Sequence, residues 1–175
     1  MTLDEKRKHL SDFITLYNAI EENETKVGRK GYVAEAHNLC SAIVETQSGT
    51  HVYYSTSAYG QIRKEYQGLF IQNLNTKPYR DFCDSLPAFQ KGVLGHHTEF
   101  QLINYIYTNI MTFVNPVHIT LFSAIKVCPS CFKMLENFQT AYLNLDVYEL
   151  DVRNNGLVEA NLCIGTSGDR TIHVI

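Results

Sequence analysis

The sequence has no uninterrupted apolar run long enough to cross a bilayer, and its first residues lack the apolar core of a secretory signal peptide. We therefore expect a soluble protein that makes no contact with a membrane. Internal repeats and low-complexity segments are also missing, which excludes repeat arrays and polar disordered tracts.

The sequence also lacks an excess of basic residues. It has 15 Lys and Arg against 18 Asp and Glu, so its formal charge is -3. This balance excludes a protein whose affinity comes from neutralising many phosphates at once. Any contact with nucleic acid has to be local. The basic residues of segment 60–94 are the candidates for it, although an ordinary solvated helix face explains them more simply.

Cysteine occurs in an odd number, so the five thiols cannot all pair within one chain. Together with the missing signal peptide, this favours a reducing compartment. Cys128 and Cys131 form a Cys-x-x-Cys pair, and the chain contains no second such pair. A closed structural zinc site made of four sulfurs is therefore improbable.

Length and composition indicate one domain over residues 1–175. A chain of this size can bury one core, and its 45% hydrophobic and 19% charged residues are ordinary for a globular protein. Apolar residues at helical spacing predict an amphipathic helix over 2–21. Two strand-like runs, 39–46 and 51–56, predict a β-hairpin. We interpret residues 60–94 as a helical insertion, with one helix reaching Leu74 and a shorter one near Phe82.

The second half of the chain alternates helices and strands. His97 opens a predicted helix that Asn115-Pro116 ends, and Pro129 suits the first position of another helix. A turn signal at Asn154-Asn155-Gly156 leaves no room for a helix between the strands on either side, so these two strands should be antiparallel neighbours. The predicted strands of this half cover residues 117–125, 145–152, 157–164 and 170–175.

Two short motifs in this half carry metal-binding chemistry. Cys128 and Cys131 lie one helical turn apart, so one metal ion can reach both sulfurs, and a helix N-terminus lowers the pKa of a thiol. His97 is the natural third ligand, which leaves a fourth position open for water, as in catalytic zinc sites. Such an ion lowers the pKa of water from ~15.7 to about 7. Glu99, two residues further on, is predicted to move protons rather than to bind the metal.

His-x-Glu followed by Cys-x-x-Cys is the signature of zinc nucleobase deaminases. With its order of strands and helices, the chain resembles the zinc-dependent cytidine deaminase superfamily over residues about 39–164. The antiparallel ending is similar to the branch that contains free cytidine deaminases and bacterial toxin deaminases. The resemblance implies an α/β fold, a three-layer α/β/α sandwich whose mixed sheet has antiparallel last two core strands. It also implies that His97, Cys128 and Cys131 bind Zn²⁺ and that Glu99 is catalytic.

The function that the resemblance implies is hydrolytic deamination of a nucleobase, with cytosine favoured, in a nucleotide or a nucleic acid. As a bacterial toxin or effector, the protein would meet an immunity or host protein. It would work in the cytoplasm or, secreted without a signal peptide, in a target cell. Tyr54, Ser57 and Tyr59, around the end of the second strand, are candidates for binding substrate. The chain departs from the family at Val127, where the family usually has Pro before the first Cys.

Two other functions stay open. One is a catalytically inactive deaminase-like zinc protein that binds a partner, but a purely structural site has no need of a carboxylate at the position of Glu99. The other is a Cys-x-x-Cys oxidoreductase. Thioredoxin-like proteins, however, carry that pair after the first or second strand and not as late as residue 128.

Overall fold

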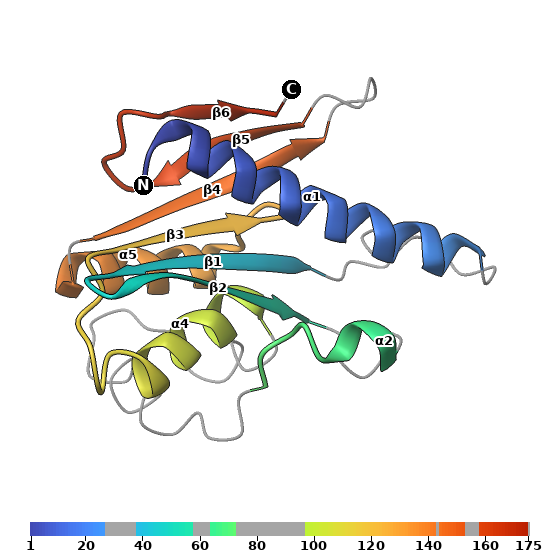
Figure 1. Cartoon of the computed structure of the whole chain (residues 1–175). Helices are drawn as coiled ribbons and strands as arrows, with labels where there is room; N and C mark the ends of the chain where they lie inside the picture. Colours follow the sequence, from blue (N-terminus) through green and yellow to red (C-terminus); the bar gives the residue numbers. More distant parts are fainter. Residues whose placement is uncertain (27–37, 58–63, 73–96, 143, 153–157, 175) are drawn as a thin grey trace.

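The computed structural model describes residues 1–26, 38–57, 64–72, 97–142, 144–152 and 158–174. Its strands form one mixed sheet in the order β2-β1-β3-β4-β5-β6, in which β3 and β4 pair in parallel and every other pair is antiparallel (Figure 1). In chain order, the elements are α1 (Leu3–Lys26), β1 (Leu39–Thr46), β2 (Gly49–Thr56), α2 (Lys64–Gln67), α4 (Thr98–Asn109), β3 (His118–Ser123), α5 (Pro129–Tyr142), β4 (Leu145–Val152), β5 (Val158–Ile164) and β6 (Thr171–His173).

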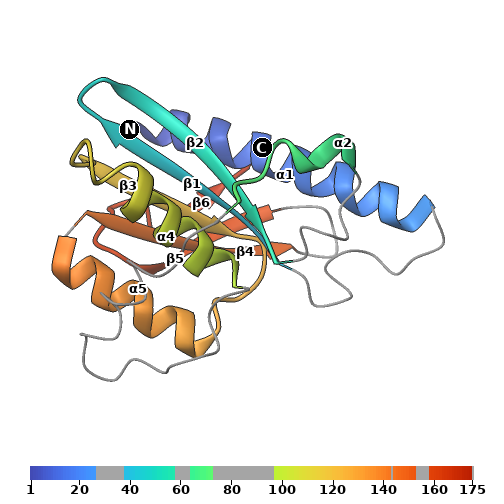
Figure 2. The same cartoon turned by 90° about the horizontal axis from the view of Figure 1, so that it is seen from below.

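Helices cover both faces of the sheet. α1 crosses one face, while α4 and α5 lie on the other (Figures 1 and 2). Side chains of β1 alternate between the two layers: Ala42 and Val44 pack with α4 and α5, whereas Leu39 and Ile43 pack with α1. A strand buried on both faces needs apolar residues at nearly every position, which explains the continuous apolar runs of β1 and β3.

α1 is an integral part of this core. Leu10, Phe13 and Ile20 are buried against the sheet. Near its start, the Lys6 ammonium lies 2.9 Å from an Asp169 carboxylate oxygen and donates a hydrogen bond to the Ser167 hydroxyl. These two contacts of Lys6 therefore join α1 to the turn before β6.

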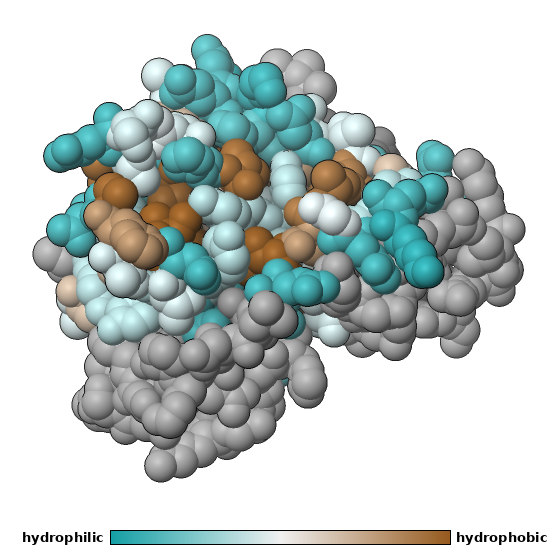
Figure 3. Space-filling view, turned by 60° about the horizontal axis from the view of Figure 1, so that its bottom comes forward, coloured by the Kyte–Doolittle hydropathy of each residue, from teal (hydrophilic) through white to brown (hydrophobic). Residues whose placement is uncertain are grey.

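The face formed by α4 and α5 shows apolar residues in separate patches among hydrophilic ones (Figure 3). Both helices place most of their apolar residues against the sheet, where Leu102, Ile103, Leu135 and Phe138 are buried. None of the described helices combines the length and the apolar character needed to cross a membrane.

The predicted helix through Leu74 is wrong within the described residues. α2 is a single turn, Lys64–Gln67, and the chain then runs beside β2, where Phe70 forms a parallel bridge with Tyr54. The Ile71 N–H donates to the Tyr54 carbonyl, and Phe70 is buried in the α1 layer. Because these residues pair with the sheet, the helical spacing of the apolar residues does not produce a helix here. The rest of the 60–94 insertion, other than residues 64–72, lies outside the described residues.

The strand predictions for the second half are confirmed, including the antiparallel pairing of β4 with β5. The turn Asn154-Asn155-Gly156 lies outside the described residues.

The functional consequence of the topology is at one edge of the sheet. β1 is antiparallel to β3, with Cys40 opposite Ser123, so the start of β1 lies beside the carboxyl end of β3. We call this the site edge.

Candidate metal centre

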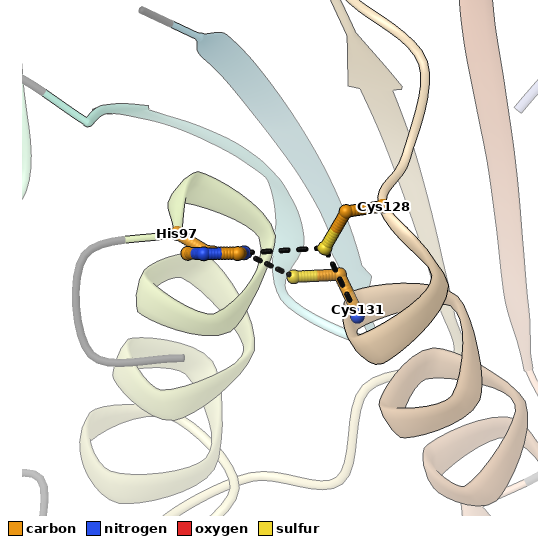
Figure 4. A group of neighbouring side chains, drawn as sticks. All are labelled: His97, Cys128 and Cys131. Carbon is orange, nitrogen blue, oxygen red and sulfur yellow. Dashed lines mark hydrogen bonds between the residues drawn. The ribbon is translucent and has the colours of Figure 1, made fainter. Parts of the chain in front are cut away.

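Three side chains from two helix N-termini meet at the site edge. The His97 Nδ1 atom lies 3.1 Å from the Cys131 Sγ atom and 3.2 Å from the Cys128 Sγ atom (Figure 4). The three potential ligand atoms all lie within 4.8 Å of one another. This is the group that the two motifs predict, and it could hold a metal ion.

Local backbone structure brings each of these side chains into place. His97 is the extended N-cap residue of α4, and its carbonyl accepts the Gln101 N–H. Cys128 directly precedes α5, which begins at Pro129 as predicted, and Cys131 lies in the first turn. The Cys131 N–H donates to the Cys128 sulfur across 3.4 Å. The two sulfurs therefore share one helix end, opposite the end of α4 that carries the imidazole.

The loop before Cys128 is held by a hydrogen bond between its backbone and a side chain of β4. The buried Val127 donates its N–H to the Glu149 carboxylate of β4 over 2.9 Å. Proline has no N–H to donate. A proline at position 127 could therefore not make this contact with Glu149.

The donor set is compatible with zinc. Zinc binds imidazole nitrogen at about 2.0–2.1 Å and thiolate sulfur at about 2.3 Å with tetrahedral angles, which puts N and S roughly 3.5 Å apart. The observed separations of 3.1 and 3.2 Å are within a few tenths of an ångström of that value. Burial, followed by the nearby Glu99 carboxylate, raises the pKa of the Cys131 thiol. This direction is opposite to the one that the sequence predicts from the helix N-terminus, and a bound divalent cation would deprotonate a coordinating thiol.

Glu99 lies beside the three ligands and is not a member of their group. Glu99 is 4% exposed, and its carboxylate accepts hydrogen bonds from three side chains. The donors are Asn38 Nδ2 at 3.1 Å, the Ser123 hydroxyl at 3.1 Å and the Thr98 hydroxyl at 3.0 Å. The Glu99 carboxylate is therefore held by neighbouring side chains, apart from the three atoms that could hold a metal ion.

A pocket of about 140 Å³ joins the carboxylate to the candidate ligands. Its wall carries both reactive parts of the site, Glu99 and Cys128, and the exposed Lys126. The pocket suits a compact group rather than a whole large ligand, because pockets that take drug-sized ligands measure about 300–1,000 Å³. The lining residues are Asn38, Ser57, His97, Thr98, Glu99, Ile125, Lys126 and Cys128.

The predicted substrate-binding residues have different outcomes. Ser57 lines the pocket. Tyr54 does not line it: its ring stacks on Phe13 of α1, with centroids 6.3 Å apart, on the other face of the sheet. Neighbouring strand residues point to opposite faces, and it is Tyr53 that contacts Tyr105 of α4. Tyr59 lies outside the described residues.

Sequence reasoning missed Asn38, Thr98 and Ser123, although all three are buried around Glu99. Ser123 could have been found from the sequence, because it ends an apolar strand that is covered on both faces, and a hydroxyl there needs a buried partner. No pattern in the sequence predicts the position of Asn38, because its side-chain partners Thr98, Glu99 and Ser123 lie 60, 61 and 85 residues away in the chain.

Comparisons of the chain with protein-family models, with curated proteins and with solved structures find no match. Function is therefore argued from the residues of the site and from the fold that positions them.

Proposed function

We propose that the protein is a zinc-dependent hydrolytic deaminase acting on a nucleobase, with cytosine favoured, in a nucleotide or a nucleic acid. One observation carries the proposal: the buried Glu99 carboxylate lies in the same pocket as a His–Cys–Cys group without belonging to it. A purely structural metal site gives no reason for that carboxylate, whereas deaminases require it.

His97, Cys128 and Cys131 would hold the ion, which supplies a Lewis acid with a free fourth position and thereby acidifies water. In the reaction, the carbon that carries the amino group gains the oxygen of one water molecule and loses ammonia. Glu99 accepts the two protons of that water in turn on a carboxylate oxygen and delivers one to the ring nitrogen beside that carbon and the other to the departing amine, which leaves as ammonia. A buried acid at the wall of a small pocket is well placed for both transfers, because substrate and water meet there.

The fold supports the same reaction class. A hairpin, a helix that starts after His97, an interior strand, a helix that starts after Cys128, and an antiparallel β4–β5 pair follow one another. Helices cover both faces of the sheet (Figure 2). The cytidine deaminase-like three-layer sandwich is part of the proposal, and this arrangement is what such a sandwich requires.

The biological context is a further part of the proposal. We propose a bacterial toxin or effector whose protein partner is an immunity or host protein and whose substrate lies in the cytoplasm of the cell it reaches. The family resemblance is the support for this context.

The experiment that tests the proposal is a substrate panel on the zinc-loaded protein. Ammonia release is measured with free cytosine, cytidine, its nucleotides, and single- and double-stranded DNA and RNA, together with the adenine counterparts. We expect at least one cytosine-bearing substrate to give one ammonia for each uracil formed. A zinc-loaded protein that is inert on the whole panel would contradict the proposal and favour a partner-binding module. A metal-free protein with a reversible Cys128–Cys131 disulfide would favour an oxidoreductase.

A further inference from the structure

We propose that Asn38 is a positioning residue, which holds the Glu99 carboxylate at a fixed place in the pocket. The inference rests on the proposed function, because it assigns the residue that keeps the proposed proton carrier aligned. Asn38 directly precedes β1 and is 7% exposed.

The Asn38 side-chain amide is the hub of the hydrogen bonds around Glu99. Its Nδ2 atom lies 3.1 Å from Glu99 Oε1, 2.9 Å from Thr98 Oγ1, 3.0 Å from Ser123 Oγ and 3.5 Å from Cys40 Sγ. An amide has two protons, so at most two of these four acceptors are bonded at once. The charged carboxylate is the strongest acceptor among them, which favours the bond to Glu99.

The opposite end of the same amide is held independently of Glu99. Asn38 Oδ1 accepts the Ile125 N–H over 3.2 Å, which ties the residue to the loop between β3 and α5. The Asn38 backbone is tied to the end of β2, because its N–H donates to Ser57 Oγ and its carbonyl accepts the Ser57 N–H. Asn38 is therefore a rigid support for the carboxylate, anchored to two of the segments that line the pocket.

No other side chain of this size can both donate a hydrogen bond to Glu99 and accept one from the Ile125 N–H. Aspartate could accept the Ile125 N–H but could not donate to Glu99 while ionised, and leucine could do neither. Among the side chains that the structure describes, loss of this donor leaves Glu99 with the hydroxyl groups of Thr98 and Ser123. The Ser123 hydroxyl also lies 2.8 Å from the Ile125 carbonyl, so its single proton is shared between two acceptors. Without Asn38, the carboxylate should lose its alignment while the three metal ligands stay in place.

The kinetic test compares Asn38→Asp and Asn38→Leu with Asn109→Asp, a matched change at an exposed residue of α4. On a substrate that the wild type turns over, we expect both Asn38 variants to lose about 100-fold in kcat, as small misplacements do, with KM changed by less than about threefold. Zinc content and the absorption spectrum of the cobalt-substituted protein should match the wild type, and Asn109→Asp should behave as wild type. An Asn38→Asp variant with wild-type kcat would overturn the assignment, as would a loss of kcat that follows loss of metal.

A second measurement needs no substrate. In NMR spectra of the zinc-loaded protein, the side-chain amide protons of Asn38 should exchange slowly with solvent, and Glu99→Gln should shift their resonances while those of Asn109 stay unchanged. Fast exchange and no shift would overturn the inference even if the wild type releases ammonia. An Asn38 amide that behaves as expected in a protein inert on the whole panel would refute the proposed function and leave the Asn38–Glu99 contact intact.

Discussion

The Nδ1 atom of His97 lies 3.1 Å from the Sγ atom of Cys131, although 34 residues separate the two in the chain. They meet because α4 and α5 both begin at the site edge, on the same face of the sheet (Figure 2). Two helix N-termini thus form two sides of one small site. The N-terminus of α4 has His97 as its N-cap, and the N-terminus of α5 contains Cys131.

The first prediction concerns the metal ligands. Cys128→Ser, Cys131→Ser and His97→Ala should each lower the affinity for zinc by at least about 100-fold, because each removes a ligand atom, and even changes to residues that only hydrogen-bond to a ligand cost about 10–100-fold. Zinc content after dialysis against a chelator, measured by mass spectrometry, checks this. Cys163→Ser is the matched control: Cys163 is a half-buried thiol outside the ligand group, and burial raises its pKa to about 12. Wild-type zinc content in the three ligand variants would refute the site.

A second prediction concerns Gly165, which follows β5 with φ at 121°. A Cβ atom there would collide with the Asp146 side chain and lie 2.9 Å from the Leu145 carbonyl. Gly165→Ala should therefore lower the free energy of unfolding by about 2–4 kcal/mol, which combines backbone strain with overpacking. Urea unfolding measures the change. Gly168→Ala, with no atom near the added methyl group, should stay within about 0.5 kcal/mol of wild type, and equal effects at both glycines would contradict this explanation.

A third prediction concerns pH. Burial alone raises the pKa of Asp146, but the hydrogen bond and charge of His118, followed by the Ser167 and Thr166 N–H groups, outweigh it, so the pKa lies below its usual value. A depressed carboxyl pKa contributes stability that is present above the unfolded value of about 3.9 and is lost as pH falls through the folded value.

Asp146→Asn removes this contribution. The difference in unfolding free energy between wild type and Asp146→Asn, measured by urea unfolding, should be fully present at about pH 5. It should shrink below about pH 4. A difference that stays constant down to pH 2.5 would mean that the carboxylate contributes no pH-dependent stability.

The strands and the grouping of the three candidate ligands can be predicted from the sequence because their signals are local. β1, β3 and β4 are apolar runs or alternations whose side chains face two helix layers, and the ligand spacings are those of two helix N-termini. Tyr54 shows the limit of this reasoning. The end of β2 was correctly placed near the site, but the face of the sheet to which each residue points depends on the register with β1.

Non-local pairing explains the other differences. Phe70 continues a helical spacing in the sequence, yet it pairs with Tyr54 and is buried beneath α1. Asn38 is one polar residue before a strand, and its role depends on partners supplied by β2, α4 and the loop before α5. Such contacts leave no periodic pattern in the sequence from which they could be predicted.

The central claim is that Glu99 moves protons in a zinc-dependent deamination, and one measurement tests it most directly. Ammonia release and zinc content are measured together for wild type, Glu99→Gln and the matched control Glu22→Gln, which changes an exposed residue of α1 on the opposite face of the sheet. We expect Glu99→Gln to bind one zinc per chain and to lose at least about 1,000-fold in kcat, as for loss of general acid–base catalysis, while Glu22→Gln keeps wild-type activity. A zinc-loaded Glu99→Gln variant that releases ammonia at the wild-type rate would contradict the claim.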